Sequence, residues 1–263
     1  MSIINYKILN GFTNIVHFCT TRKGGVSVGN YGSFNISPFC GDNAENQTQN
    51  LNILSKKVGI EPENIIIPFQ THETTVKNID HTFIKINEKE RLDFLNGVDG
   101  LITDLHGICI GVTTADCVPI IYYDGVNNVI AVAHAGWRGT YGKIVSKTIE
   151  KMVMDYGSNP KNIYAVIGPS ISQQVYKVGG EVLNYFERSD FPVKYFFECR
   201  KNEYYLDLWS ANKWLLIESG VPENQIEIAG MCTYSESEKF FSARRMGIQS
   251  GRMLSGIMLK FNN

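Results

Sequence analysis

Short apolar runs rich in β-branched residues dominate the middle of the chain. Two of them, 107–112 (GICIGV) and 118–123 (VPIIYY), are separated by the polar stretch TTADC, and a third, 127–137 (NNVIAVAHAGW), follows the pair Asp124-Gly125. Runs of this length and composition are typical of buried strands, and Asp-Gly between two of them indicates a hairpin. The pattern therefore predicts three buried strands in this block.

Apolar residues recur at helical spacing on both sides of this block. A helix is predicted from the capping residue Asp42 to about Val58, where Gly59 closes it. A second helix is predicted over 143–157, directly after a glycine-rich turn. The first packs through Leu51, Leu54 and Val58, and the second through Ile144, Val145, Ile149, Met152, Val153 and Tyr156.

The remaining segments complete a mixture of strands and helices. Residues 70–79 carry His72 into an alternating, strand-like segment, and 163–171 is another apolar strand. Helices are expected over Glu181 to Glu187, over Leu208 to Glu218 and over the C-terminal 250–260. Because strands with hairpin signals alternate with helices, we expect an α+β fold of mixed or antiparallel sheets with helices packed outside.

The composition describes a folded protein without a polyanionic partner. Hydrophobic residues make up 43% of the chain and charged residues 19%, and 25 Lys and Arg against 26 Asp and Glu leave a net charge of −1. Such a chain offers no electrostatic basis for binding nucleic acid or an anionic membrane. No repeat or linker marks a boundary, so we expect one domain over 1–263. With no signal peptide or membrane span, and six cysteines outside CxxC pairs, we expect a cytoplasmic protein.

Three residues near predicted strand ends form a candidate metal site. His72, Cys117 and His134 supply one thiolate and two imidazoles, a set that suits zinc and leaves a fourth position open. Their spacing matches no zinc finger or ribbon, so the alternative of a buried cysteine and two hydrogen-bonded histidines stays open. His134 lies between a strand and a glycine-rich turn, where side chains commonly reach ligands.

Three further residues are candidates for proton transfer or anion binding. Asp116, beside Cys117, is either a general base near the metal or the cap of a turn. Arg22 in TTRKGG and Arg138 in GWRGTYG are candidates for holding a phosphate, the second at the N-terminus of a predicted helix. Arg244 and Arg245 are weaker anion candidates, because arginines in polar loops are mostly solvated.

The sequence resembles the YfiH/YlmD family, described first as laccase-like multicopper polyphenol oxidoreductases and later as purine nucleoside phosphorylases with adenosine deaminase activity. The shared motifs occur in family order across nearly the whole chain, and one departure is Ala243, where the family pattern has an aromatic residue. The motifs are TTRKGGVS (20–27), QTH (70–72), VDGLIT (98–103), TADCVPI (114–120), AHAGWRGT (133–140), IGPSIS (167–172), FFSARR (240–245) and SGRM (250–253).

This resemblance implies a single α+β domain with one zinc site held by His72, Cys117 and His134, copper being the other candidate metal. It implies phosphate-dependent cleavage of adenosine, inosine or guanosine to the base and ribose 1-phosphate, with methylthioadenosine cleavage and adenosine deamination alongside. The implied partners are therefore purine nucleosides and phosphate, and the chain is expected to be a monomer or homodimer. Asp116 would then move protons, and Arg22 and Arg138 would hold phosphate.

Three other functions compete with this hypothesis. Copper oxidation of phenols follows from the older family description, but a multicopper oxidase needs many histidines and this chain has five. A cysteine hydrolase would use Cys117 as a nucleophile activated by His134. A zinc-stabilised binding module would bind a nucleoside without turning it over.

Overall fold

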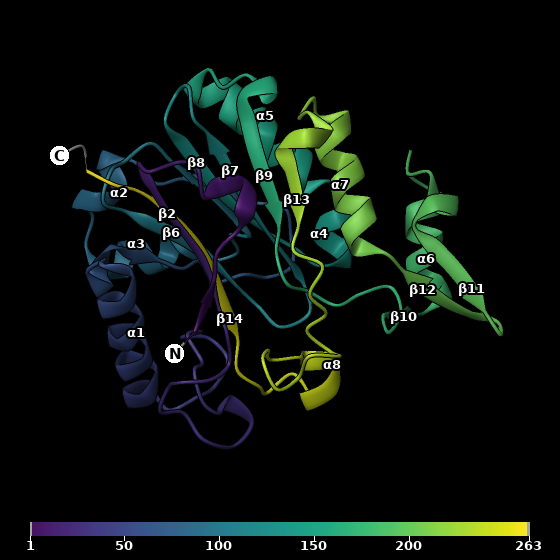
Figure 1. The fold of residues 1–263 in the computed structure, drawn as a ribbon, viewed down its shortest axis with the longest axis horizontal. Coiled ribbons are helices and arrows are strands. Elements are labelled where there is room, and N and C mark those ends of the chain that lie inside the picture. The colour runs from purple at the N-terminus through teal and green to yellow at the C-terminus, as the bar shows by residue number, and fades with distance from the viewer. Residues whose placement is uncertain (1, 262–263) are drawn as a thin grey trace.

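Two large β-sheets form the centre of the computed structural model, which describes residues 2–261 (Figure 1). Both sheets are mixed, with parallel pairs only at β4/β5, β9/β13 and β3/β6. The six-stranded sheet has the order β13 (Ile226–Ile228), β9 (Ile163–Ile167), β7 (Val118–Asp124), β8 (Val129–Ala135), β5 (Gly100–Thr103) and β4 (Val76–Asn78). The five-stranded sheet has the order β1 (Ile3–Ile4), β2 (Ile15–Thr20), β14 (Met253–Leu259), β6 (Cys109–Thr114) and β3 (Ile65–Ile66).

The alternation of side chains along β7 and β8 builds two different cores. Ile120 and Tyr122 of β7 pack in the core on the helical side of the six-stranded sheet. Ile121 of β7 and Ile130 of β8 point the other way, into a core shared with Ile110 and other residues of the five-stranded sheet. Since side chains on a strand alternate between the two faces, both faces of β7 and β8 must be apolar. This explains why their sequences are continuous apolar runs.

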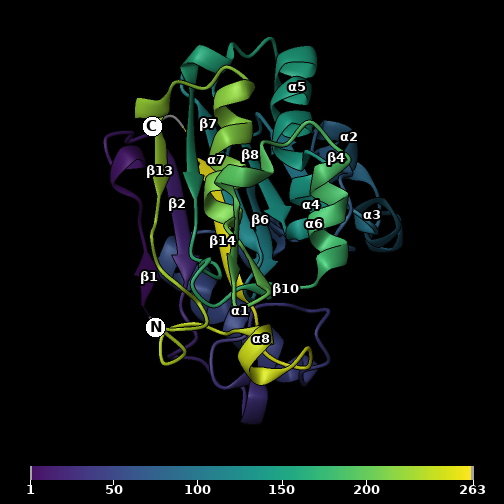
Figure 2. The same ribbon diagram turned by 90° about the vertical axis from the view of Figure 1, so that its right-hand side faces the viewer.

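Helices cover the outer faces of the two sheets (Figure 2). Helices α5 and α7 pack on the six-stranded sheet, and α1 packs on the five-stranded sheet through Leu54, with Phe18 and Leu254 beneath it. The layers are therefore helix, sheet, sheet, helix. The helices are α1 (Ala44–Val58), α2 (His81–Lys85), α3 (Glu88–Leu95), α4 (Trp137–Tyr141), α5 (Ile144–Tyr156), α6 (Gly180–Glu187), α7 (Leu208–Glu218) and α8 (Ala243–Met246).

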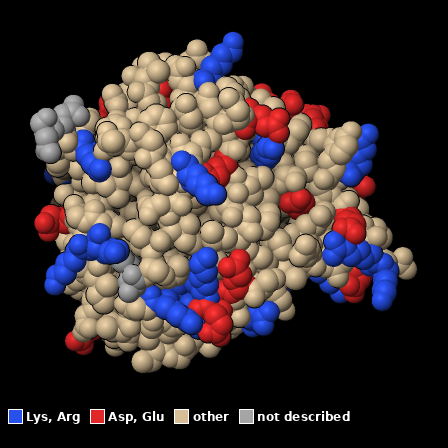
Figure 3. All heavy atoms as spheres, viewed as in Figure 1, with Lys and Arg blue, Asp and Glu red and all other residues tan. Residues whose placement is uncertain are grey.

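A small antiparallel sheet extends from this sandwich. It consists of β10 (Lys177–Val178), β12 (Glu203–Leu206) and β11 (Phe197–Arg200), and with α6 it projects at the right of Figure 1. Helix α8 lies at the bottom of both ribbon views, near the start of β14. Within residues 2–261, no helix combines the length and the apolar character that crossing a membrane requires. Figure 3 shows acidic and basic side chains interspersed on the face it presents, without a region of one sign.

Most of the predicted elements are confirmed, including the α+β class. The three central strands are β6, β7 and β8, and Leu208–Glu218 is helical as expected. The cap of α1 is Asn43, one residue after the predicted Asp42, because its side chain accepts from the backbone N–H groups of Glu45 and Asn46. Val153 was wrongly placed on the buried face of α5, since 39% of its surface is exposed.

One predicted element was wrong, and another is shorter than predicted. The C-terminal 250–260 forms no helix but contains β14, which lies between β2 and β6 and is buried at every position. A strand buried on both faces shows no alternation, so its apolar residues imitated a helical pattern. In 70–79 only Val76–Asn78 is a strand, and His72 lies in a bend before it.

Candidate metal centre

The three residues proposed as metal ligands come together in the folded chain. One ligand atom from each of His72, Cys117 and His134 lies within 4.8 Å of the other two. The two imidazole rings stand edge to face with their centroids 4.8 Å apart. His134 is buried, Cys117 is half-buried and His72 is exposed, so the cluster is open on one side. The sequence separations, which match no known motif, are bridged by the fold.

Cys117 and His134 are brought together by the crossing from one sheet to the other. The segment 115–117 connects β6 of the five-stranded sheet to β7 of the six-stranded sheet. Side chains alternate along β8, so His134 lies on the same face as Ile130 and Val132, which point into the space between the sheets. Pro119 of β7 is the register partner of His134, so Cys117 lies just beyond that end of the hairpin. The site therefore forms where the two sheets meet.

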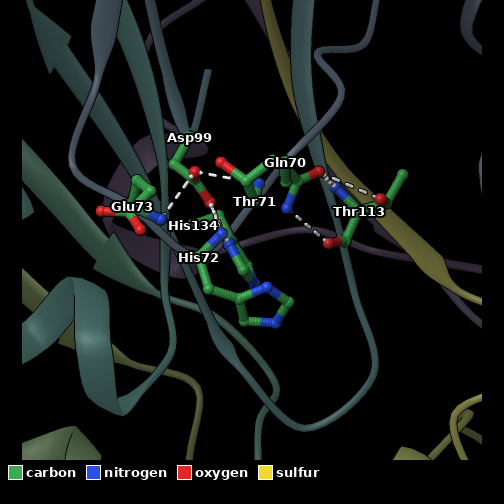
Figure 4. Close-up of polar contacts among 7 residues, drawn as sticks. All are labelled: Gln70, Thr71, His72, Glu73, Asp99, Thr113 and His134. Carbon is green, nitrogen blue, oxygen red and sulfur yellow. Dashed lines mark hydrogen bonds and ion pairs between the residues drawn. The ribbon is translucent and has the colours of Figure 1, made fainter. Parts of the chain in front are cut away.

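The loop that carries His72 is held by one buried carboxylate, that of Asp99 (Figure 4). Its Oδ2 accepts from the backbone N–H groups of Thr71 (3.1 Å) and Glu73 (2.9 Å), and its Oδ1 accepts from that of His72 (3.1 Å). His72 has φ 65°, in the left-handed region that few non-glycine residues occupy. This conformation lets three consecutive N–H groups converge on one anion and turns the imidazole toward the cluster.

The same carboxylate orients the second histidine. The Nδ1–H of His134 donates to Asp99 Oδ1 over 2.7 Å, and its backbone N–H donates to the Asp99 carbonyl over 2.7 Å. With Nδ1 protonated, Nε2 is the nitrogen left to bind a metal, which is how carboxylates commonly support metal-bound histidines. Sequence reasoning missed Asp99, although an acidic residue in the apolar motif VDGLIT was a signal that could have found it.

Gln70 anchors the other end of the His72 loop to the five-stranded sheet. Its Oε1 accepts from the backbone N–H (2.8 Å) and the hydroxyl (3.0 Å) of Thr113, and its Nε2 donates to the Thr113 carbonyl over 2.9 Å (Figure 4). Because Thr113 lies at the end of β6, shortly before Cys117, this contact fixes the histidine loop relative to the thiol. Gln70 was also missed at the sequence level.

The cluster favours the charged form of its sulfur. Burial raises the pKa of the Cys117 thiol, but the charges and N–H donors of His134 and His72 outweigh it and lower that pKa to about 6. Burial lowers the pKa of His134, and the nearby Cys117 and Asp99 more than reverse this, to about 9. Burial raises the pKa of Asp99 while the His134 contact and the loop N–H groups lower it, with a net lowering. The thiolate is the form that binds metals.

The surroundings of the cluster fit a bound zinc ion. A thiolate and two imidazoles, neutral once a metal displaces the extra proton of His134, match the donors that zinc takes, and three protein ligands are the number found in catalytic zinc sites. Gly136 leaves the space next to them clear, since a Cβ there would lie 2.9 Å from Cys117 Sγ and 3.5 Å from His72 Cδ2.

Gly136→Ala is expected to lower zinc affinity by about tenfold or more, because the added methyl group displaces the sulfur. The backbone at Gly136 has φ −70° and ψ −178°, which alanine adopts freely, so the change acts through this contact alone. Competition with a chromogenic chelator measures the affinity. Gly11→Ala is the matched control, since a Cβ there meets nothing within 4 Å. Unchanged zinc affinity in Gly136→Ala would contradict a metal site at this cluster.

The Asp116 carboxylate is hydrogen-bonded to the C-terminal part of the chain. Its Oδ1 accepts from the Thr233 hydroxyl (2.7 Å), and its Oδ2 accepts from the Ser242 hydroxyl (3.0 Å) and the Arg244 backbone N–H (2.7 Å). Its φ of 91° lets the main chain turn sharply into Cys117. Asp116 thus ties the segment before Cys117 to α8, and its predicted part in proton transfer stays a prediction.

A cavity of about 590 Å³ opens above the cluster. The rings of Phe39 and Phe69 form part of its wall, 5.0 Å apart and edge to face, and each is more than a third exposed. Tyr176 and Ala243 also line it, so the alanine that departs from the family pattern does border the cavity. Its two cationic side chains are Arg244 and Arg252.

The two arginines predicted to hold phosphate lie outside the residues that line this cavity. Arg22 donates from Nε and Nη2 to the Gly32 carbonyl (3.2 and 3.0 Å) and from Nη1 to the Ser237 carbonyl (2.6 Å). Its guanidinium therefore joins two loops. Arg138 is exposed and lies over the ring of Trp137, 4.4 Å from its centroid. A phosphate contact at either residue stays a prediction.

The chain is similar in sequence and in structure to known proteins. Residues 16–260 match a family model described as multi-copper polyphenol oxidoreductase laccase. A purine nucleoside phosphorylase from Bacteroides thetaiotaomicron is 44% identical over 98% of this chain and 96% of its own. Adenosine deaminase RL5 from an unknown prokaryotic organism is 39% identical over 92% and 93%. The crystal structure of the hypothetical protein YfiH from Bacillus licheniformis superposes with a TM-score of 0.91, at 31% identity and over 98% and 97% of the two chains.

Proposed function

Because the chain belongs to the YfiH/YlmD family, whose model is described as multi-copper polyphenol oxidoreductase laccase, we propose that it is a zinc-dependent purine nucleoside phosphorylase that also deaminates adenosine. The observation that carries this proposal is the open cluster of His72, Cys117 and His134 at a cavity of about 590 Å³. A cavity of that size accommodates a nucleoside. One relative is named a purine nucleoside phosphorylase and another an adenosine deaminase, and both names support this proposal.

Different residues of the chain would bind the metal and the substrate. His72, Cys117 and His134 would hold zinc, with Asp99 keeping Nδ1 of His134 protonated so that Nε2 faces the ion. Zinc bound in this way supplies Lewis-acid activation of an oxygen or nitrogen atom in its remaining position. Phe39 and Phe69 offer apolar ring surfaces against which a purine can pack.

The proposed substrates are adenosine, inosine and guanosine, with methylthioadenosine as a further one. In phosphorolysis an oxygen of HPO₄²⁻ bonds to C1′ of the ribose while the bond from C1′ to the purine nitrogen breaks. The electron pair of that bond leaves with the purine, and the proton of HPO₄²⁻ ends on it, so that ribose 1-phosphate and the free base balance the reaction. Charge develops on the sugar in such a reaction, so both reactants must be positioned before the bond breaks.

Purified zinc-loaded protein is expected to release hypoxanthine from inosine only when phosphate is present, with ribose 1-phosphate as the second product. The same protein is expected to convert adenosine to inosine without phosphate. Chromatography of bases and sugars measures both reactions. His134→Ala is expected to lower each rate by about 100-fold or more, since it removes a metal ligand. His81→Ala changes an exposed histidine and serves as its control. If the wild type releases no more hypoxanthine than His134→Ala does, the proposal is refuted.

Copper oxidation of phenols is the second candidate, because the matching family model carries that description. A cysteine with two histidines is a donor set that copper also accepts. A multicopper oxidase needs several copper sites, however, and residues 2–261 contain one cluster of this kind. Stoichiometric copper after purification, together with oxygen consumption on a phenol, would favour this candidate over the nucleoside enzyme.

A further inference from the structure

The cavity above the cluster carries more positive than negative side-chain charge at its wall. Besides the metal-ligand candidates, its charged lining residues are Arg244, Arg252 and Asp116. The Asp116 carboxylate already accepts three hydrogen bonds from Thr233, Ser242 and the Arg244 backbone, so it neutralises neither guanidinium by direct contact. Among residues 2–261, no carboxylate forms an ion pair with Arg244 or Arg252. Two arginines without a carboxylate partner, Arg244 exposed and Arg252 half-buried, therefore line a cavity that has room for an anion.

Contacts at one edge fix the guanidinium of Arg244. Its Nη1 donates to the Lys177 carbonyl over 2.8 Å, and its Cζ lies 5.1 Å from the centroid of the Tyr176 ring, which also lines the cavity. Within the described residues, its Nε and Nη2 groups have no hydrogen-bond acceptor. An arginine held on one side with free N–H groups on the other is arranged to bind an oxyanion with little loss of side-chain entropy.

Arg252 is fixed by the loop that precedes it. Its Nη1 donates to the carbonyls of Ser250 (2.6 Å) and Gly251 (3.0 Å), and its Nη2 donates to the Ile248 carbonyl over 2.8 Å. The Nε–H group has no acceptor among residues 2–261. These bonds shape the 248–251 loop around the charge, so the guanidinium has a defined place at the cavity wall.

We propose that Arg244 and Arg252 form the subsite that binds the phosphate co-substrate, an inference that rests on the proposed phosphorolysis. The ligand is a tetrahedral oxyanion, to which Arg244 offers Nε–H and Nη2–H as forked donors, while Arg252 adds its Nε–H and its positive charge. Both side chains line the cavity that also contains the metal-ligand candidates, whereas Arg22 and Arg138 do not. The subsite thus places phosphate and nucleoside in one open cavity, as attack on the ribose requires.

Asp116 connects this subsite to the metal cluster. Its carboxylate accepts from the Arg244 backbone N–H over 2.7 Å, and its neighbour in the chain is Cys117. One buried side chain with three hydrogen bonds therefore links the residue before Cys117 to the start of α8. In this arrangement Asp116 is a positioning residue that holds Arg244 in place relative to Cys117.

Steady-state kinetics of Arg244→Gln and Arg252→Gln test the subsite. Each change is expected to raise the KM for phosphate in inosine phosphorolysis by about tenfold or more, because a charge-assisted contact is lost. Adenosine deamination, which uses no phosphate, is expected to fall by a clearly smaller factor than phosphorolysis at low phosphate. Arg244→Lys keeps the charge without the fork and is expected to give an intermediate KM for phosphate.

Two other arginine variants make the result specific. Arg188→Gln removes an exposed charge at the end of α6 and is the matched control. Arg138→Gln separates the two assignments: an increase in KM for phosphate there, with none in Arg244→Gln, overturns the proposed subsite. An equal loss of phosphorolysis and deamination in the Arg244 and Arg252 variants also overturns it, since that pattern reports a structural role.

The source of the oxyanion is tested with inosine 5′-monophosphate as an inhibitor. If both variants lose this inhibition while their KM for phosphate is unchanged, the guanidinium groups bind a nucleotide phosphate, and the assignment to free phosphate is wrong. A wild-type chain without phosphate-dependent release of hypoxanthine overturns the proposed function and this subsite with it. Wild-type phosphorolysis with unchanged KM for phosphate in both variants overturns the subsite alone.

Discussion

Cys117→Ser is expected to abolish stoichiometric zinc binding and to lower both phosphorolysis and deamination by at least about 100-fold. The thiolate is the one anionic ligand of the cluster, and contact with His134 and His72 lowers its pKa to about 6. A serine hydroxyl at this position stays protonated at neutral pH and binds zinc poorly. Metal analysis after dialysis and the two product assays measure these losses.

The fold is expected to survive this substitution. Cys117 is only half-buried, and the two cores between and outside the sheets are built without it. Circular dichroism of the variant should therefore match that of the metal-free wild type. Cys199→Ser changes an exposed cysteine on β11 and is the control for losing a thiol. Full zinc content in Cys117→Ser would place the metal elsewhere in the protein.

Chelation of the wild type separates the zinc enzyme from a cysteine hydrolase. If zinc is required, removing it abolishes both nucleoside reactions, and adding it back restores them. If Cys117 is instead a nucleophile paired with His134, the chelated wild type keeps a hydrolytic activity that Cys117→Ser loses, and an electrophile labels Cys117 covalently. A third pattern, nucleoside binding without turnover and a large fall in Tm on chelation, would indicate a binding module.

The candidate metal ligands were predictable because their chemistry is carried by residue type. His72, Cys117 and His134 are rare residues at predicted strand ends, and the family resemblance assigned the same three. The sequence alone does not reveal that His72 lies in a bend with positive φ, because that conformation depends on Asp99, which is 27 residues away in the chain. Long-range hydrogen bonds of this kind have no local signature.

The arginines that line the cavity, in contrast, could not be identified from residue type. Arg22 was proposed from its loop motif TTRKGG and Arg138 from its place at the N-terminus of a predicted helix, and both arguments are local. Which arginine lines the cavity depends instead on the path of the chain after β13, where α8 and the 248–251 loop return to the cluster. That return was hidden by the mistaken helix over 250–260, since a strand buried on both faces has no distinguishing period.

Asp99→Ala is expected to lower the unfolding free energy of the metal-free protein by about 3–5 kcal/mol and zinc affinity by about 10-fold to 100-fold. The substitution leaves His134 Nδ1 and the backbone N–H groups of Thr71, His72 and Glu73 without their acceptor. Of these donors Nδ1 of His134 is buried and would carry the full cost of desolvation, whereas Thr71, His72 and Glu73 are exposed residues. Urea unfolding of the metal-free protein measures the first effect, and chelator competition measures the second.

Asp99→Asn refines this test, because it keeps the shape of the side chain. Oδ1 can still accept from Nδ1 of His134, but an amide nitrogen in place of Oδ2 would face the N–H groups of Thr71 and Glu73. Zinc affinity and stability should therefore fall between wild type and Asp99→Ala. Asp104→Asn, at an exposed position after β5, is the control. If Asp99→Asn binds zinc as tightly as wild type, the negative charge of Asp99 is not needed to orient the two histidines.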